Sequence, residues 1–404
     1  MSLSLKPSLR FVEFDSSWEK YNLSDLGEFK NGVNKAAEDF GHGMPFVNLM
    51  DVFGQNSIGL PELDLVNSTE KERELYSIKK GDTLFIRSSV KRQGVGETAV
   101  CEHDIEDTVY SGFLIRFRSN DNIEHGFKRF CFWTPKFRNS LLRMSTTSAN
   151  TNINQESLSK LKLALPTIEE QQKIADFLSS IDRKSSLLKE KYAVLAQYKK
   201  GMMQKLFKQE IRFKDDNGND FPDWQQLKVK DVTTNFSNRN KKLIEAEVYS
   251  VTNSNGFILQ SAQFEGKIAG DDLANYKVVT KGDFAYNPAR INVGSIAQFH
   301  GDTAIISSLY VCFKTNSNVT DRFFSHWLDL DKTKFDIGRF GEGGVRVYLW
   351  YPLFSMIPII VPSIQEQEKI AFFIDEIDKK LDSISHQIDL TQSFKKGLLQ
   401  QMFV

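Results

Sequence analysis

A stretch of 43 residues occurs twice in this chain of 404 residues, and this repeat constrains the fold more than any other feature. Residues 165–207 align with residues 361–403 at a constant offset of 196 without a gap, and sixteen of the 43 positions are identical. Self-similarity at a fixed offset indicates a duplicated structural unit. We therefore expect the chain to contain one architecture twice.

Each copy of the repeat predicts a long helix with a defined start. Thr167 and Ser363 each follow a proline and precede a glutamate, Glu170 or Glu366, by three positions. This pattern is typical of a capping box, in which the hydroxyl accepts from a first-turn amide and the carboxylate reaches back to the cap amide. At 1.5 Å per residue, each helix would be roughly 60 Å long.

Apolar residues then recur at alternating spacings of four and three, which is typical of a coiled-coil seam. The seam positions that we expect to pack between helices or to dock a partner are Ile181, Leu188, Tyr192, Leu195 and Met202 in the first copy and Ile377, Leu381, Ile384, Ile388 and Leu398 in the second. The alternative is two amphipathic helices buried in ordinary globular cores. The strict seam favours helix packed against helix, most simply the two copies against each other.

The segments before the helices also match. Trp18 opens a strand-like segment that ends at Leu26, and a similar segment restarts at Trp224. Even the leads agree, because residues 9–11 (LRF) resemble residues 211–213 (IRF). The repeated unit is therefore a globular domain followed by a helix.

Within the first globular part, Val47–Met50, Thr83–Arg87 and Gly112–Phe117 predict strands separated by turn-forming residues. The chain is thus expected to be α+β, with two mixed α/β domains separated by two long antiparallel coiled-coil helices in an internal pseudo-twofold repeat. The expected bounds are 1–164 for the first globular domain, 165–208 for the central helix, 209–360 for a linker and the second globular domain, and 361–404 for the C-terminal helix.

Composition bounds the class of protein. Apolar residues make up 40% and charged residues 26% of the chain, as in soluble globular proteins. The net charge of zero neither supports nor excludes nucleic-acid binding, because an acidic face can cancel a basic one. Three scattered cysteines and the lack of a signal peptide or a long apolar run predict a cytoplasmic protein.

No enzyme signature stands up to inspection. The chain lacks a phosphate-binding loop of the G-x-x-x-x-G-K-[ST] type. Residues 287–290 (NPAR) only partly match a methyltransferase motif, and residues 341–344 (GEGG) fit a turn better than a nucleotide loop. Residues 101–103 (CEH), with His125 and Cys131, lack the tight paired spacing of zinc ligands. We predict no catalytic residue, no metal and no cofactor.

Basic and amide side chains gather in turn-like segments of both halves. Arginine, lysine, asparagine and glutamine can make bidentate contacts to base edges or hold phosphates, and loops on a rigid frame are where such residues act. The candidate DNA-binding residues are Lys30, Asn34, Lys35, Arg87, Lys91 and Arg92 in the first half and Arg239, Lys241, Lys242, Arg290, Arg339 and Arg346 in the second.

The whole pattern resembles the specificity (S) subunit of type I restriction–modification enzymes. The residues that carry the resemblance are 166–175 (PTIEEQQKIA) and 362–371 (PSIQEQEKIA), together with the domain starts at Trp18 and Trp224 and the Lys-Lys-Gly sequence near each helix end. The match covers nearly the whole chain.

The resemblance implies a non-catalytic subunit of an enzyme complex. Each globular part would be a target recognition domain that reads one half of a bipartite double-stranded DNA site, and the helices would set the spacing. DNA methyltransferase (M) subunits would dock on the chain, and restriction (R) subunits would join for cleavage. S-adenosylmethionine would belong to the methyltransferase, and ATP and magnesium to the restriction subunit.

Three other hypotheses stay open at this point. The partner could be a single fused methyltransferase–nuclease in place of separate subunits. The chain could instead be a coiled-coil scaffold with two protein-binding heads and no DNA role. The third is a stand-alone enzyme, which would show turnover when purified alone.

Overall fold

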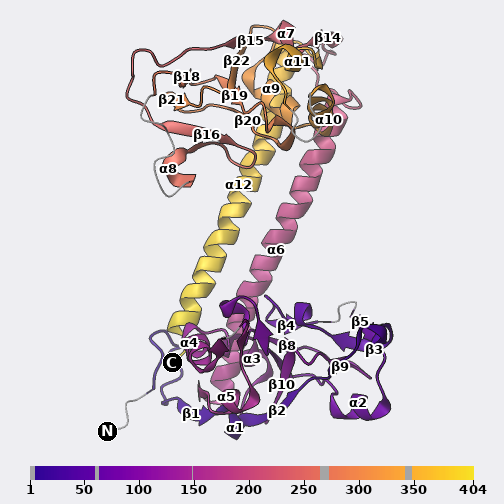
Figure 1. Cartoon of the computed structure of the whole chain (residues 1–404), viewed down its shortest axis with the longest axis vertical. Coiled ribbons are helices and arrows are strands. Elements are labelled where there is room, and N and C mark those ends of the chain that lie inside the picture. Colours follow the sequence, from indigo (N-terminus) through magenta and orange to yellow (C-terminus); the bar gives the residue numbers. More distant parts are fainter. Residues whose placement is uncertain (1–4, 60–62, 148, 264–272, 342–347) are drawn as a thin grey trace. The chain divides into compact units, whose positions relative to one another are not determined.

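The computed structural model describes residues 5–59, 63–147, 149–263, 273–341 and 348–404. The chain divides into two compact units, one formed by Met1–Glu190 with Ser385–Val404 and one formed by Lys191–Ile384. The two long helices are α6 (Ile168–Phe207) and α12 (Ile364–Gln401), and each contributes residues to both units (Figure 1). The predicted pair of long helices is confirmed.

The globular part of the first unit is built on a five-stranded sheet. Its strands, in spatial order, are β2 (Gly27–Asn31), β10 (Leu114–Ser119), β6 (Thr83–Ile86), β8 (Thr98–Cys101) and β4 (Ser57–Ile58). Successive side chains of a strand point to opposite faces, so Phe85 joins one buried cluster and Leu84 and Ile86 join another. Helices α3 (His125–Cys131) and α4 (Pro135–Met144) contribute to the cluster of Phe85 and cover that face.

The other elements of the first unit are short. β1 (Glu19–Asn22) pairs antiparallel with β13 (Lys162–Leu165). The remaining ones are β3 (Phe40–Val47), β5 (Asp64–Val66), β7 (Ser88–Ser89), β9 (Val109–Tyr110), β11 (Thr146–Thr147), β12 (Thr151–Asn152), α1 (Leu23–Leu26), α2 (Glu70–Leu75) and α5 (Gln155–Ser159). β5, β3 and β9 form one small sheet, and β11, β12 and β7 form another. The unit is mixed α/β, as the sequence predicts.

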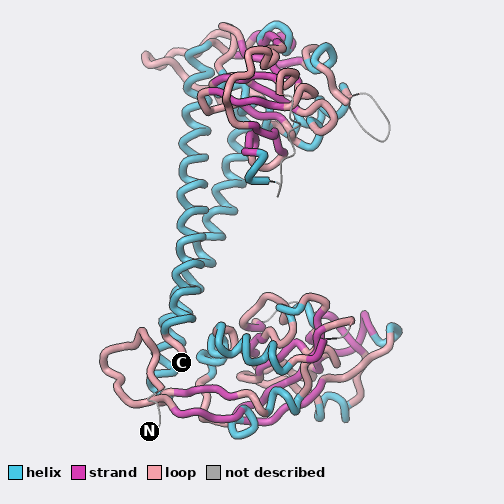
Figure 2. The backbone as a smooth tube through the Cα atoms, turned by 60° about the vertical axis from the view of Figure 1, so that its left-hand side comes forward, coloured by secondary structure: helices cyan, strands magenta, loops and turns pink. Residues whose placement is uncertain are grey.

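The second unit contains two four-stranded sheets, and Figure 2 shows strands and helices interleaved in it. The first sheet has the order β15 (Thr233–Phe236), β22 (Val311–Thr315), β19 (Phe284–Tyr286) and β20 (Ile296–Gln298). The second has the order β17 (Gly256–Leu259), β16 (Val248–Thr252), β21 (Thr303–Ile306) and β18 (Lys277–Thr280). The other elements are β14 (Gln225–Lys228), which pairs with β23 (Pro358–Val361), and the helices α7 (Val229–Val232), α8 (Gln260–Gln263), α9 (Asp321–Asp329), α10 (Asp331–Phe340) and α11 (Tyr351–Phe354).

Residues that are identical in both copies of the repeat make the same contacts in both units. The carboxylate of Glu170 is fully buried and accepts hydrogen bonds from Arg10, at 2.6 and 2.7 Å, and from the indole of Trp18. Glu366 is equally buried and accepts from Arg212, at 2.8 and 3.1 Å, and from Trp224. The matching leads and tryptophans of the sequence thus tie each domain start to the beginning of a long helix.

This geometry corrects the predicted capping boxes. The Ser363 hydroxyl accepts from the Glu366 amide at 3.4 Å, as expected of a cap. The glutamates, however, do not reach back to the cap amides, because Arg10 and Arg212 hold their carboxylates. An arginine offers a charge-assisted bidentate pair, which is stronger than a bond to a neutral amide.

Two further pairs of contacts repeat. Gln171 donates from its amide to the Asn122 carbonyl, at 3.0 Å, and Gln367 donates to the Asn318 carbonyl, also at 3.0 Å. The Lys395 ammonium pairs with Asp182 in the first unit, and the Lys199 ammonium pairs with Asp378 in the second. The two helices therefore run antiparallel in each unit, the start of one beside the end of the other.

Two predicted strands are only partly right, because local side-chain bonds bend the backbone. The expected strand from Trp18 to Leu26 turns into α1 at Leu23, where Asp25 accepts from the Asn22 amide at 3.0 Å. The expected strand Val47–Met50 ends with β3 at Val47, and a 3-10 turn follows in which Asp51 accepts from the Asn48 amide at 2.7 Å. Short polar side chains of this kind compete with strand ladders for backbone groups. Among the described residues, no helix has the length and apolar character that a membrane crossing requires.

Candidate nucleic-acid interface

Three predicted segments of the first unit meet around the turn that precedes β10. The Gly112 amide donates to the Val33 carbonyl at 2.8 Å, and the Arg87 amide donates to the Phe113 carbonyl at 2.8 Å. A Cβ at Gly112 would lie 1.9 Å from the Asn34 Oδ1, so only glycine allows this approach. Asn34 and Arg87 are exposed, and Phe113 is 60% exposed beside them. The structure thus brings two of the candidate residues to one surface.

Lys91 and Arg92 lie on the loop between β7 and β8, and both are exposed. Arg138 of α4 fixes this loop by donating to the carbonyls of Gln93 and Val95, at 2.6 and 2.7 Å. The two cations therefore project from a segment whose backbone is held in place. Such a segment can hold phosphates without first being ordered.

The other two candidates of the first unit are engaged inside their own domain. The Lys35 ammonium is 2.8 Å from the Glu72 carboxylate, its side chain is only 9% exposed, and its hydrogen bond lowers the pKa of the Glu72 carboxyl. Lys30 lies on β2 with its ammonium 5.3 Å from the ring centre of Tyr76. Lys35 was predicted as a DNA-binding residue, but in the structure α2 supplies a carboxylate partner for its ammonium from 37 positions away in the sequence.

In the second unit, Arg290 lines a small cavity, and the segment of Arg239 is linked to the same cavity through Lys277 and Tyr310. Arg239 forms a backbone bridge with Lys277, whose ammonium donates to the Tyr310 carbonyl at 2.5 Å. Tyr310 lines a cavity of about 220 Å³ together with Arg290 and Asn253. Arg239 and Arg290 are both exposed, as are Lys241 and Lys242, which follow Arg239.

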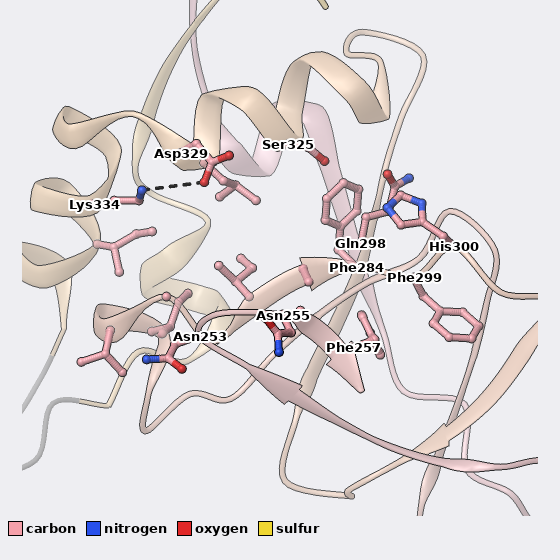
Figure 3. A pocket seen from close by; sticks show the side chains of 18 of the residues that line it. Asn253, Asn255, Phe257, Phe284, Gln298, Phe299, His300, Ser325, Asp329 and Lys334 are labelled. Atoms are coloured by element: carbon pink, nitrogen blue, oxygen red, sulfur yellow. Dashed lines mark ion pairs between the residues drawn. The ribbon is translucent and has the colours of Figure 1, made fainter. Parts of the chain in front are cut away.

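A larger cavity of about 700 Å³ adjoins this one. Asn253 and Val293 line both cavities, and Asn255 and Asn292 line the larger one. Figure 3 shows Asn253 and Asn255 on one side of the larger cavity, opposite the side chains of α9. The three asparagines are exposed. We refer to Asn253, Asn255, Arg290, Asn292 and Val293 as the amide ridge.

The backbone of the amide ridge is fixed locally. The Thr252 hydroxyl accepts from the Asn255 amide at 3.2 Å, and Gly256 follows with a φ of +58° that favours glycine. Sequence reasoning missed these asparagines. The signal that could have found them is the turn sequence Asn-Ser-Asn-Gly at 253–256 between two strand-forming segments.

One exposed apolar position near the candidate residues is shared by the two units. Phe113 precedes β10, and Leu309, which is 196 positions further along, precedes β22. Phe113 is 60% and Leu309 69% exposed, which is unusual for side chains of this size. An exposed apolar side chain therefore occurs at this position of the repeat in both units.

The last two candidates do not join this surface. Arg339 lies within α10, 3.4 Å from Asp336, with its guanidinium over the ring of the adjacent Phe340. It was expected in a loop beside the glycine run, but the helix extends to Phe340. Arg346 lies outside the described residues.

Burial along the helices follows the predicted seam only in part. Ile181, Ile377, Leu381, Ile384 and Leu398 are at most 8% exposed, and Leu188, Leu195, Met202 and Ile388 are partly buried. Tyr192 is 39% exposed, so it is not a buried seam residue, and its prediction as a partner-docking position is not tested by this exposure. Met203 is buried, whereas Met202 is partly buried. In a straight α-helix, positions that repeat every 3.5 residues rotate about 20° per heptad around the helix axis. Residues with a strict heptad spacing therefore move out of the contact face along a long helix.

Two pairs of equivalent helix positions carry exposed apolar side chains. Val194 of α6 is 61% exposed and its counterpart Leu390 of α12 is 56% exposed. Tyr198 is 50% exposed and its counterpart Phe394 is 57% exposed. We refer to Val194 with Tyr198, and to Leu390 with Phe394, as the two apolar stripes. Contiguous exposed apolar groups mark surfaces that bind other proteins.

The described residues offer one group that could hold a metal, formed by His326, Asp375 and Asp378. Its carboxylates already have cationic partners. Arg322 donates to Asp375 at 2.6 Å, and Lys199 donates to Asp378 at 2.6 Å. The cluster is explained as an ion-pair network between α6, α9 and α12.

The cysteine and histidine residues considered as zinc ligands are also accounted for. Cys101 and Cys131 are buried, and burial raises the pKa of both thiols. The Glu102 carboxylate is 3.2 Å from His125 and 3.4 Å from Arg129, and the His125 hydrogen bond is the main cause of its lowered pKa. Burial likewise raises the pKa of Cys312 to about 12, so this thiol is protonated at neutral pH.

In a comparison with known protein families, both copies of the repeated unit match the same family. Residues 15–197 and 222–391 each match the family described as "Type I restriction modification DNA specificity domain". The chain belongs to this family. It contains the specificity domain twice, and the two matches together span most of its length.

Named relatives in the family agree with this assignment. The chain is 26% identical over 408 residues to the type I restriction enzyme MjaX specificity subunit of Methanocaldococcus jannaschii, covering 96% of this chain and 93% of the relative. It is 24% identical to the MjaVIII specificity subunit of the same organism, over 67% of this chain and 68% of the relative. It is also 24% identical to the EcoKI specificity subunit of Escherichia coli, over 39% and 35%.

Solved structures support the fold. The S subunit of a type I restriction–modification system from M. genitalium superposes with a TM-score of 0.60 at 14% identity, covering 99% of both chains. A chain from a structure on complex assembly and conformational transition of the type I system gives a TM-score of 0.54 at 13% identity, covering 95% of this chain and 96% of that one. At these identities the likeness shows the fold alone.

Proposed function

We propose that this chain is the DNA sequence-specificity subunit of a type I restriction–modification complex, in which each globular part reads one half of a bipartite site. The observation that carries the proposal is the doubled specificity domain, and exposed guanidinium and amide groups in both units support it. The chemistry of the reaction belongs to partner subunits, and this chain supplies the choice of sequence.

The side chains of the two surfaces suit two kinds of DNA contact, one to base edges and one to phosphates. Arg87 and Asn34 in the first unit, and Arg290 with Asn253 in the second, carry groups that pair bidentately with guanine or adenine edges in the major groove. The flanking lysines and arginines, Lys91, Arg92, Arg239, Lys241 and Lys242, suit phosphate contacts that fix register without reading sequence.

Binding to DNA by the assembled complex tests the proposal against the scaffold alternative. Neutralising several phosphates releases counterions, so the affinity for a duplex should fall steeply and linearly on a logarithmic scale as salt rises. A scaffold with two protein-binding heads predicts no measurable binding to duplexes that carry the methylated motif. The measurement is a titration of the complex with labelled duplex between about 50 and 200 mM salt.

We further propose that the two apolar stripes dock two copies of a methyltransferase subunit. They occupy equivalent positions of the repeat, so one type of partner could bind twice through the same surface. S-adenosylmethionine would be held by that partner, and ATP with magnesium by restriction subunits that join for cleavage. A fused methyltransferase–nuclease would satisfy the same surfaces, and the neighbouring genes would tell the two arrangements apart.

Charge placed on the stripes is expected to break the complex. We predict that the double variant V194E/L390E reduces recovery of the methyltransferase in co-purification at least tenfold, because burying a carboxylate without a partner in an apolar interface is strongly unfavourable. The matched control is F372E. Phe372 is also exposed on α12, at 59%, but its counterpart in the repeat is Asp176. Equal loss in the control would contradict the stripe assignment.

Lengthening the helices is expected to change the gap between the half-sites. Four extra residues add about 6 Å of helix, which corresponds to one or two base pairs at about 3.4 Å per step. We predict that inserting four residues after Leu188 and after its counterpart Ile384 lengthens the tolerated spacer and leaves both half-sites unchanged. A change in the sequence of either half-site would contradict a spacing role for the helices.

A further inference from the structure

Each unit contains a cavity that is lined by a short helix, by β-strand residues and by the end of a long helix. In the first unit, a cavity of about 380 Å³ is lined by α4, by β1 and β13, and by residues 403–404 after α12. In the second unit, a cavity of about 270 Å³ is lined by α10, by β23 and by residues 204–208 at the end of α6. Phe403 and Phe207, 196 positions apart, line the two cavities, as do Lys136 and Lys332. The two cavities are therefore equivalents in the repeat.

Their charges differ completely. The cavity of the first unit is lined by five basic side chains and by no acidic one. Four of these, Lys20, Lys136, Arg143 and Lys162, form no ion pair with any described residue, and all four are exposed. Like charges held close together without counter-charges create a strongly positive local potential. We refer to these four residues as the basic rim.

The equivalent cavity of the second unit is neutral. It is lined by two lysines, Lys208 and Lys332, and by two aspartates, Asp331 and Asp336. Asp336 is 2.9 Å from Lys332, and Asp331 is 3.0 Å from Lys200. Because the equivalent cavity has the same architecture but balanced charges, the fold does not require the basic rim.

The floor beneath the basic rim is apolar and aromatic. Trp18 and Phe137 line it and are 2% and 4% exposed, and the Phe403 ring lies 6.1 Å from that of Trp18. A flat array of cations would suit DNA phosphates, whereas a hollow with an apolar floor favours a ligand that also has an apolar side chain. Such a floor can bury an aromatic or aliphatic anchor while the rim pairs with carboxylates.

The cavity also lies apart from the DNA surface proposed for the same unit. Lys136 and Arg143 of α4 line the cavity, whereas Arg138 and Leu141 of the same helix face the loop of residues 92–96. Helix α4 therefore stands between the basic rim and the loop that carries Lys91 and Arg92. The basic rim is a separate surface and not an extension of the candidate DNA contacts.

We propose that the basic rim and its apolar floor form a docking site for an acidic peptide segment of a partner protein, with one apolar side chain as its anchor. Carboxylates of the segment pair with the lysines and Arg143, and the anchor fills the hollow over Trp18 and Phe137. The site occurs in the first unit only, because its counterpart is neutralised by Asp331 and Asp336. A partner that binds here distinguishes the two halves of an otherwise symmetric frame.

The test is binding of a labelled peptide, Glu-Asp-Glu-Phe-Asp-Glu, to the full chain in its complex, measured by fluorescence anisotropy. We expect K136Q/R143Q to bind the peptide at least tenfold more weakly than the unchanged protein. The matched control is K332Q/R339Q, which alters the equivalent positions of the second unit and should bind the peptide normally. All four side chains are exposed, and unchanged thermal unfolding of both variants shows that they fold.

Any of four results would overturn the proposal. One is equal affinity of the two variants for the peptide, and a second is no binding of the peptide by the unchanged protein. A third is equal affinity of the unchanged protein for a peptide in which glutamine and asparagine replace the acidic residues. The fourth is a loss of affinity for a 12-base-pair duplex in K136Q/R143Q with unchanged peptide binding, which would assign the basic rim to DNA.

Discussion

Replacing Arg212 by methionine is expected to lower the free energy of unfolding of the second unit by about 3 kcal/mol. The Glu366 carboxylate is fully buried and holds two hydrogen bonds from Arg212 and one from Trp224. Methionine has a similar length but leaves this buried charge without its cation. Removing one partner of a buried pair costs more than removing both, because the remaining charge cannot regain water. Removing one partner of a fully buried pair costs about 3–5 kcal/mol, and we expect the lower value because the Arg212 side chain is 23% exposed.

The repeat supplies a graded control for this effect. Arg10 makes the equivalent pair with Glu170, but its Nη1 is buried without a partner. Replacing Arg10 by methionine removes that unsatisfied group together with the ion pair, so we expect a smaller loss than for Arg212. Hydrogen exchange of the strand pairs beside each tryptophan, β1 with β13 and β14 with β23, measures the two opening free energies separately. A loss below about 1 kcal/mol for R212M would show that the pair contributes little.

Substitution on the amide ridge is expected to change one half of the recognised sequence. We predict that N253A/R290A weakens methylation at one half-site by roughly tenfold to a hundredfold per lost contact, since a bidentate contact is worth about 1–3 kcal/mol of discrimination. The other half-site should be read as before, because its contacts lie in the first unit. Conversely, N34A/R87A should affect only that other half-site. The measurement is the methylated motif of cells that express each variant.

A control on the same cavity separates reading from folding. Lys334 lines the larger cavity but pairs with Asp329 at 3.7 Å and does not belong to the ridge (Figure 3). K334A should therefore leave the methylated motif unchanged. If K334A and N253A/R290A alter the motif equally, the amide ridge does not carry the specificity.

The architecture could be predicted from the sequence because its repeated residues have structural roles. Gln171 and Gln367 are buried and bond the same backbone positions of the two units, and Asp182 and Asp378 each pair with a lysine of the other long helix. Such buried polar contacts depend on exact side-chain geometry. They stay recognisable in both copies when the surfaces between them differ.

The candidate site could be predicted only in part. Arg87 and Asn34 were expected and are exposed on one surface, but Lys35 is paired with Glu72, which lies 37 positions away. Asn253 was missed because a turn asparagine has an ordinary structural role far more often than a binding one. Which loop charges stay free depends on partners that only the folded chain brings near.

The seam shows a similar limit. Of the ten seam positions predicted from the heptad spacing, five are buried, four are partly buried and Tyr192 is 39% exposed. The pattern of apolar residues predicts that two helices pack together. It does not predict at which residues the heptad positions of a straight helix rotate out of the contact, because that depends on the difference between 3.5 and 3.6 residues per turn.

Genome-wide methylation mapping of the source strain, with and without this gene, tests the central claim most directly. The account predicts that a motif of two specific half-sites separated by a fixed gap is methylated in the parent strain and unmethylated after deletion. Restoring the gene should restore the same motif, and restoring N253A/R290A should change one half of it. An unchanged set of methylated sites after deletion, in a strain whose partner methyltransferase is expressed, would contradict the account.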